Sequence, residues 1–264
     1  MTMILPKIEQ PIYDLTIPSN GQPIKIRPML AKEEKLLLMA KESEDDNDIL
    51  GAIKQVVNNC ILTENVDIDR LAIFDLEFIF LRLRAFSASN TIEVGYRDNE
   101  DYDAKHSQLV KNGVPEAKAI EEAIKYSSYS FKVDLNQITV QGLDQTPDNM
   151  IPVNDHLTLR MRRPSASLYT NKEFLNADSK AMLDLLIYNC IDAVVQDGNV
   201  ILFDRETPVD QKQFLEDLPI PVMDKVREYL ANQPSIYYEI NYTNKNGKER
   251  KIQFQTLNDF FSLR

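Results

Sequence analysis

Residues 48–62 have the sequence DILGAIKQVVNNCIL. Their apolar side chains recur every three or four positions, which places them on one face of a helix: Ile49, Ile53, Val56, Val57, Cys60 and Ile61. Residues 178–195, DSKAMLDLLIYNCIDAVV, have similar spacing and repeat the tripeptide Asn-Cys-Ile. We therefore predict two core helices, the second over residues 179–196, with Cys60 and Cys190 at matching places.

The elements around these helices follow the same order. A strand that closes with Arg-Pro precedes each helix, at Arg27-Pro28 and at Arg163-Pro164, and further helices and a hairpin follow it. This order predicts an α+β fold of two similar, possibly duplicated units, each of helices packed with a β-hairpin or small antiparallel sheet. We place the first unit at residues 1–142, a connector rich in turn-forming residues at 143–152, and the second unit at 153–264. A chance match of the tripeptide is the alternative.

Alternation and helical periodicity predict the remaining elements. We expect strands at residues 12–17, 24–27, 91–96, 129–140, 155–163 and 200–203, helices from residue 32 and at 67–86, 209–218 and 222–230, and a hairpin at 236–254. The turn of that last hairpin is predicted at residues 244–247, which read Asn-Lys-Asn-Gly.

Two segments are candidates for contact with a partner. Residues 97–128 form an insertion too long for a hairpin loop, and we predict a helix that begins near Pro115 and carries Ile120 and Ile124. This insertion is a partner-binding flap or, equally, a decoration without a partner. At the chain end, Leu257, Phe260 and Phe261 form a second candidate contact, because adjacent aromatic residues often anchor interfaces. The alternative for these three residues is a turn of helix folded back onto the core.

Composition favours a protein partner over nucleic acid or membrane. The 264 residues include 41 acidic and 30 basic side chains, a net charge of −11, so the overall field repels nucleic acid and anionic membrane. The basic run at residues 160–163 is interpreted as one solvated or salt-bridged face of a strand rather than a phosphate site. Charges within residues 67–86 argue against a membrane span, and residues 1–11 lack a secretion signal.

The sequence contains no recognisable catalytic, metal-binding or cofactor-binding pattern. His106 and His156 lie in unrelated contexts, and no Gly-rich phosphate loop or metalloprotease motif occurs. Cys60 and Cys190 are expected to be buried and unreactive, because each lies on an apolar helix face. We therefore expect no catalytic residue, no metal and no cofactor. A hydrolase built on the unclustered carboxylates of Asp75, Glu77, Asp134 or Asp155 is the lower alternative.

Four strings resemble a known family: residues 4–43, residues 53–62 (IKQVVNNCIL), residues 131–138 (FKVDLNQI) and residues 257–263 (LNDFFSL). They are similar to the baseplate hub subunit and hub-assembly family of T-even-like contractile-tailed bacteriophages. The resemblance implies a non-enzymatic late protein that is made in the host cytoplasm and contacts other baseplate hub or tail proteins. It covers both a virion subunit and an assembly chaperone absent from the mature virion, and it leaves the oligomeric state open.

Overall fold

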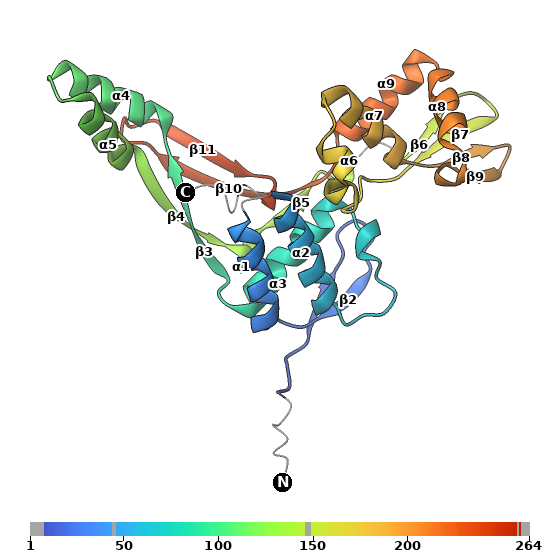
Figure 1. Ribbon diagram of the computed structural model, residues 1–264, viewed down its shortest axis with the longest axis horizontal. Helices are drawn as coiled ribbons and strands as arrows, with labels where there is room; N and C mark the ends of the chain where they lie inside the picture. Colours follow the sequence, from blue (N-terminus) through green and yellow to red (C-terminus); the bar gives the residue numbers. More distant parts are fainter. Residues whose placement is uncertain (1–7, 44–45, 146–148, 258, 260–264) are drawn as a thin grey trace, which may run out of the picture. The chain divides into compact units, whose positions relative to one another are not determined.

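The computed structural model describes residues 8–43, 46–145, 149–257 and 259. As predicted, the protein is α+β, with small antiparallel sheets of two to four strands (Figure 1). Two compact units divide the chain, and each is built from two separate stretches: Met1–Leu83 with Val140–Ser235, and Arg84–Thr139 with Ile236–Arg264. This division differs from the sequential one that we expected at residues 142–153. The reason is that two long hairpins, at residues 91–134 and 235–254, belong to the same unit although they are far apart in sequence.

The first unit contains two groups of elements. The first group is β1 (Tyr13–Thr16), β2 (Pro23–Ile26), α1 (Ala31–Glu42) and α2 (Asp46–Cys60). The second group is β6 (Met150–Pro152), β7 (Leu157–Met161), α6 (Lys172–Leu175), α7 (Ser179–Cys190), β8 (Ile191–Gln196), β9 (Asn199–Leu202), α8 (Pro208–Glu216) and α9 (Ile220–Ala231). Helix α3 (Ile73–Ser87) leads from this unit into the second, after a short 3₁₀ turn at Ile68–Arg70. The helix predicted at residues 67–86 is therefore interrupted near its start.

Helix α2 is a core element, as its periodicity predicts. Ile53, Val56, Val57 and Cys60 are all buried. The helix ends at Cys60, and Ile61 forms an antiparallel bridge with Ile26, the last residue of β2. Burying four side chains of this kind stabilises the fold by several kcal/mol, at roughly 1.5–3 kcal/mol for each large aliphatic residue.

The two Asn-Cys-Ile tripeptides have matching contacts. The backbone N–H of Arg27 donates to the Cys60 carbonyl (3.0 Å), and that of Arg162 donates to the Cys190 carbonyl (2.7 Å). The guanidinium of Arg27 donates to the Asn59 carbonyl (2.9 Å), and that of Arg162 donates to the Asn189 carbonyl (2.5 Å). Each arginine thus satisfies carbonyl groups that the end of a helix leaves free. The residue equivalent to Arg27 is Arg162, one position before the arginine of Arg163-Pro164, and the duplication itself stays a prediction.

The helix predicted over residues 179–196 is wrong in its second half. Helix α7 ends at Cys190, and residues Ile191–Gln196 form strand β8 in the sheet β6-β7-β8-β9. Asp197 and Gly198 both have positive φ angles, 47° and 83°, which allow a tight two-residue hairpin turn into β9. Strand pairing with β7 and β9 therefore outweighs the helical periodicity that continues past Cys190.

The predicted connector is partly structured. Within residues 143–152, Met150–Pro152 form strand β6, which pairs with β7 through Ile151 opposite Leu159. Both of these side chains are buried in the core beneath α7 and α9. This stretch is therefore part of the first unit's sheet rather than a linker between units.

The second unit is organised around two hairpins. Its elements are β3 (Thr91–Arg97), α4 (Asn99–Lys111), α5 (Glu116–Ser127), β4 (Ser128–Asp134), β10 (Ser235–Thr243) and β11 (Glu249–Phe254). Strands β3 and β4 pair as predicted, from Thr91 opposite Asp134 to Arg97 opposite Ser128. The strand predicted at residues 129–140 is broken after Asp134, because Leu135–Gln137 form a 3₁₀ turn. Strand β5 (Thr139–Gln141), where the chain returns to the first unit, lies beside β10 in the order β11-β10-β5.

The insertion between β3 and β4 is a pair of packed helices, α4 and α5, at the end of that hairpin (Figure 1). We predicted α5, and its start at Glu116 after Pro115 is confirmed. Helix α4 was not expected, because its sequence is largely charged. Ala119 and Ala123 of α5 and Leu109 of α4 are buried, so small side chains allow the helices to approach closely.

Candidate protein-binding surface

The residues with catalytic potential have separate local partners. His106 Nε2 lies 3.0 Å from the carboxylate of Glu116 and links α4 to α5, while His156 Nδ1 lies 2.8 Å from Asp197 in a turn. Asp134 accepts a hydrogen bond from the Asn136 N–H (2.9 Å). These contacts are typical of helix and turn stabilisation.

The remaining carboxylates of the hydrolase alternative differ in their environments. Asp75 is buried and accepts the Ser19 N–H (2.9 Å), and burial raises the pKa of its carboxyl group although Ser19 and Arg163 oppose this shift. Glu77 is buried in α3, whereas Asp155 is exposed in the turn before β7. Within the described ranges, no group of three or more His, Cys, Asp or Glu side chains is arranged to hold a metal ion.

The cysteines and the basic run occupy structural positions. Both thiols are buried, and burial raises the pKa of Cys60 to about 11 and that of Cys190 to about 12. Arg160 pairs with Asp192 (2.6 Å), while Arg163 donates to the Ser19 carbonyl (3.1 Å). The interpretation of the basic run as a solvated or salt-bridged strand face is confirmed for Arg160, whereas Arg163 lies beyond the end of β7 and contacts a backbone carbonyl.

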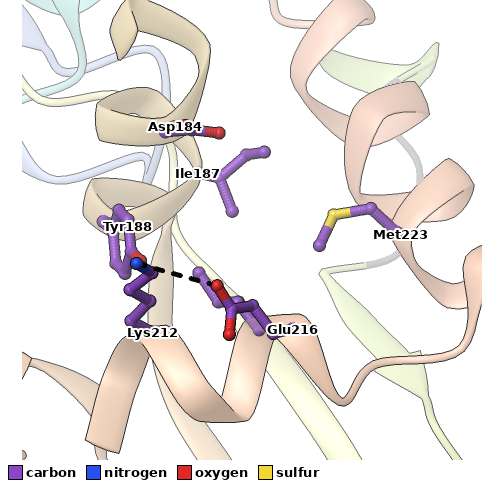
Figure 2. Close-up of a pocket in the computed structure, with 7 residues that line it drawn as sticks. Asp184, Ile187, Tyr188, Lys212, Glu216 and Met223 are labelled. Atoms are coloured by element: carbon purple, nitrogen blue, oxygen red, sulfur yellow. Dashed lines mark ion pairs between the residues drawn. The ribbon is translucent and has the colours of Figure 1, made fainter. Parts of the chain in front are cut away.

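A cavity of about 200 Å³ lies between helices α7, α8 and α9 (Figure 2). Its apolar lining is Ile187, Leu215 and Met223, and Ile187 and Met223 point towards one another across it. Its polar lining consists of Asp184, Tyr188, Lys212 and Glu216. We call this cavity the α7–α9 socket.

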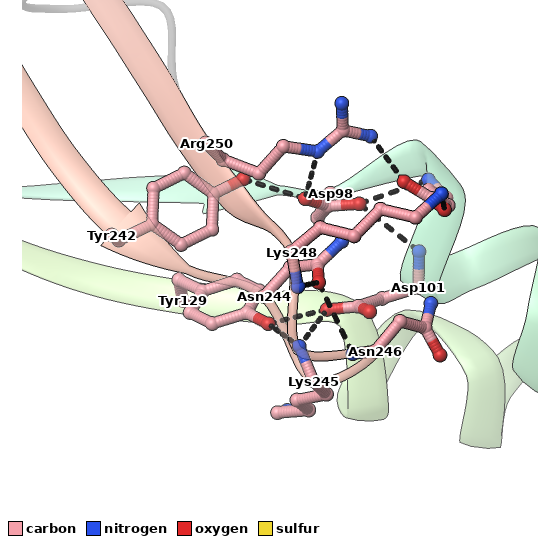
Figure 3. Close-up of polar contacts among 10 residues, drawn as sticks. Asp98, Asp101, Tyr129, Tyr242, Asn244, Lys245, Asn246, Lys248 and Arg250 are labelled. Atoms are coloured by element: carbon pink, nitrogen blue, oxygen red, sulfur yellow. Dashed lines mark hydrogen bonds and ion pairs between the residues drawn. The ribbon is translucent and has the colours of Figure 1, made fainter.

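A second feature is a network of polar side chains where the tip of hairpin β10–β11 meets the start of α4 (Figure 3). Asp98 is the N-cap of α4, and one of its oxygens accepts the N–H groups of Glu100 (2.9 Å) and Asp101 (3.0 Å). Its other oxygen accepts the hydroxyl of Tyr242 (2.6 Å) and lies 3.6 Å from the Arg250 guanidinium. Burial alone would raise the pKa of Asp98, but these hydrogen bonds and Arg250 together hold it below its ordinary value.

Asp101 makes the second set of contacts in this network. Its carboxylate is buried and accepts the hydroxyl of Tyr129 and the backbone N–H of Lys245 (3.0 Å). Burial and the bond to Asp101 raise the pKa of Tyr129 to about 12. The Lys245 ammonium lies over the rings of Tyr126 (4.6 Å) and Tyr129 (5.1 Å), a favourable cation–π arrangement.

The turn of the second hairpin is shaped to make these contacts. Asn244 is buried, and its side-chain oxygen accepts the N–H groups of Asn246 (3.2 Å) and Lys248 (2.9 Å). Gly247 has a φ of 79°, which favours glycine at the end of the turn. We call Asp98, Asp101, Tyr129, Tyr242, Asn244 and Lys245 the hairpin clasp. The clasp fixes the base of the α4–α5 helix pair to a hairpin that lies 144 residues away in sequence.

The α4–α5 pair presents apolar side chains to solvent. Ile120 and Ile124 lie one turn apart on α5 and are 37% and 39% exposed, and Val110 of α4 is 43% exposed. A mobile flap would lose conformational freedom on binding, but a helix pair held by the clasp has already lost most of it. This arrangement suits a protein-binding surface on the insertion.

The C-terminal candidates are placed differently. Leu257 is 5% exposed and thus packs within its own chain rather than forming a free contact surface. Phe260 and Phe261 lie outside the described residues.

Sequence reasoning missed the clasp because its partners lie far apart in the chain. One local signal was present: Asp98-Asn99-Glu100-Asp101 has an acidic N-cap and an acidic third helical residue, a common helix start. The pairing of Asp98 with Tyr242 has no such signal.

The model of one protein family, described as T4 bacteriophage base plate protein, matches residues 10–262 of the chain. The match therefore includes both units and the insertion. No curated protein and no solved structure matches the chain. None of the helices in the described ranges is long and apolar enough to cross a membrane.

Proposed function

The chain belongs to the T4 bacteriophage base plate protein family, and we propose that it is a non-enzymatic protein of the central baseplate hub. It acts through contacts with other hub or tail proteins, first in the host cytoplasm during assembly. In one form of this proposal it remains in the tail baseplate of the virion, and in the other it is an assembly chaperone that leaves. The proposal includes no cofactor and no nucleic-acid partner, and a hydrolase is the lower alternative.

The family match over residues 10–262 carries the proposal. The α4–α5 pair supplies a surface for it, because Ile120 and Ile124 combine partial exposure with a rigid mounting on the clasp. Apolar anchors on rigid elements contribute much of the energy at protein interfaces.

Mass spectrometry of purified virions separates the two forms of the proposal. A virion subunit gives peptides of this chain at a fixed ratio to other baseplate proteins, whereas a chaperone is absent from particles but required for their assembly. A phage that builds normal baseplates without this gene product contradicts both forms.

A paired set of variants tests the surface. Ile120→Ser with Ile124→Ser should prevent incorporation or assembly in complementation assays while the purified protein keeps its fold by circular dichroism. The control is Leu38→Ser with Met39→Ser on α1, two apolar residues that are 56% and 57% exposed. If the α5 double variant and the α1 control double variant assemble equally well, α5 is not part of the interface.

A further inference from the structure

We propose that the α7–α9 socket receives one large apolar side chain of a partner baseplate protein, on a segment that carries a lysine or arginine beside that side chain. The inference rests on the proposed function, since it assumes a protein partner. It adds a second contact site, in the first unit, and states the chemistry of what binds there.

The size of the socket favours a single side chain. Its volume is about 200 Å³, whereas sites for small molecules and cofactors span roughly 300–1,000 Å³. A cavity of about 150 Å³ is sufficient to hold benzene. A phenylalanine, leucine or methionine side chain therefore matches the space, and a nucleotide or a flavin does not.

The lining provides an apolar contact open to solvent. Ile187 is buried in the core, while Leu215 and Met223 are half-buried. Lys212 and Glu216 at the border are 69% and 60% exposed, so the socket opens at the protein surface. An inserted side chain would cover apolar atoms that the fold leaves in contact with water.

Exposed apolar residues extend this surface beyond the socket. Leu183 precedes Ile187 by one turn of α7 and is 39% exposed, and Ile220 precedes Met223 by one turn of α9 and is 75% exposed. Single exposed apolar residues are ordinary, but these two lie one helical turn from residues that line the same cavity and would enlarge its apolar surface.

The charged residues at the opening of the socket favour a lysine or arginine beside the partner's apolar side chain. Lys212 and Glu216 are 3.8 Å apart and partly neutralise each other as an i,i+4 pair. Within the described part of the chain, Asp184 forms no ion pair. In the same residues, the Tyr188 hydroxyl makes no hydrogen bond. Burial, and then the negative charges of Asp184 and Glu216, raise the pKa of Tyr188. The opening is therefore negative, and a cation beside the apolar anchor would pair with Asp184.

Methyl NMR of the full chain with ¹³C-labelled methionine tests this assignment. The Met223 signal is identified by its loss in Met223→Leu, and the probes are acetyl-Lys-Phe-Arg-amide, acetyl-Glu-Phe-Glu-amide and acetyl-Lys-Ala-Arg-amide. We expect a saturable shift of the Met223 signal with the first peptide and markedly weaker responses to the other two. No saturable shift with the first peptide, or an equal response to all three, overturns the proposal.

Two variants check the roles of charge and volume. Asp184→Asn should weaken binding of the first peptide by about two- to fivefold, as expected for loss of one exposed ion pair. The control Glu228→Gln, also on an exposed helix position, should leave the affinity unchanged. Met223→Trp should fill the socket and abolish binding of the first peptide in isothermal titration calorimetry, while the melting temperature stays near that of the parent.

The outcome is independent of the test of the proposed function. If the peptides fail to bind while assembly still depends on Ile120 and Ile124, the socket assignment is wrong and the proposed function stands. If the first peptide binds as expected while phage assembly does not need the protein, the proposed function is wrong and the socket assignment for this anchor chemistry stands.

Discussion

Arg27 illustrates how one residue supports two elements. Its guanidinium pairs with Glu33 (3.0 Å), whose side chain is fully buried, and also donates to the Asn59 carbonyl at the end of α2 (2.9 Å). Arg162 has the equivalent carbonyl contact, but its acidic neighbours Asp192 and Asp204 are 31% and 48% exposed. Arg27 therefore lies beside a buried carboxylate, whereas the carboxylates beside Arg162 are partly solvated.

This difference predicts unequal effects of the same substitution. Arg27→Met should lower the free energy of unfolding by up to about 3–5 kcal/mol. Glu33 would remain buried with only the Leu30 N–H (2.9 Å) and the exposed Lys32 (3.5 Å) as partners. Arg162→Met should cost about 1 kcal/mol, since its partners are partly exposed. Urea unfolding of both variants measures the two costs, and equal losses would mean that burial of Glu33 is not the deciding factor.

Asp75 should make stability depend on pH. Its Oδ2 atom is buried without a hydrogen bond in the described residues, and burial raises the pKa of the carboxyl group. A raised pKa in the folded state means that the folded protein binds the proton more tightly than the unfolded chain. The contribution to stability is therefore full below the ordinary Asp pKa of about 3.9 and is lost as pH rises through the raised value.

Asp75→Asn removes this loss, because a neutral amide still accepts the Ser19 N–H and leaves no buried charge. We expect the variant to be more stable than the parent at pH 7 by roughly 1–3 kcal/mol, with the difference shrinking towards pH 4. Urea titrations at pH 4 and pH 7 check this. A variant that is less stable at pH 7 would show that the ionised carboxylate has a favourable partner.

Among the elements, the clasp is expected to set the stability of the α4–α5 pair. Tyr242→Phe keeps the ring but removes the hydroxyl that donates to Asp98, so it should cost roughly 1–3 kcal/mol and speed hydrogen exchange at the first turn of α4. The matched control is Tyr237→Phe on the same strand, whose hydroxyl donates to the partly exposed Glu239. We expect that control to change stability by less than about 1 kcal/mol.

The pH dependence of this effect has a definite sign. The pKa of Asp98 is lowered in the folded state, so its contribution is present above the ordinary Asp pKa and is lost as pH falls through the folded value. The stability difference between Tyr242→Phe and the parent should therefore shrink in acid. A difference that persists at pH 2 would assign the cost to another contact of the Tyr242 hydroxyl, such as its hydrogen bond with Tyr96, rather than to the bond with ionised Asp98.

Local patterns predicted many elements because local physics determines them. Helix α2 follows from the spacing of Ile53, Val56 and Cys60, and hairpin β10–β11 follows from alternation around an Asn-Gly turn. The end of α7 was missed because Ile191 and Val194 continue the helical spacing. The competing signal was Asp197-Gly198, which favours a hairpin turn and gives residues 191–196 a strand partner on each side.

At the scale of the whole molecule, the sequence did not predict which elements share a core. Helix α5 was expected within an insertion of the first hairpin, and the second hairpin was expected in a separate unit. The structure joins them through contacts such as Asp98 with Tyr242 and Asp101 with Lys245. Pairings over 144 residues depend on tertiary packing, which a single sequence does not reveal.

The discontinuous units predict which fragments fold. Residues 84–139 joined to residues 236–264 should form a cooperative unit, because this fragment holds both hairpins, the α4–α5 pair and the whole clasp. A short Gly-Ser linker joins the two stretches between Thr139, the first residue of β5, and Ile236 of β10, and these two strands are neighbours in one sheet. Residues 143–264, close to the predicted second unit, contain Tyr242 and Lys245 but lack Asp98 and Asp101.

Circular dichroism melts and amide exchange distinguish these fragments. The joined fragment should melt cooperatively and protect the amides of β10 and β11, and Tyr242→Phe within it should lower the melting temperature. Fragment 143–264 should leave those amides unprotected, because an isolated two-stranded hairpin is at best marginally stable in water. Protection of β10–β11 in fragment 143–264, together with an unfolded joined fragment, would restore the sequential division of the chain.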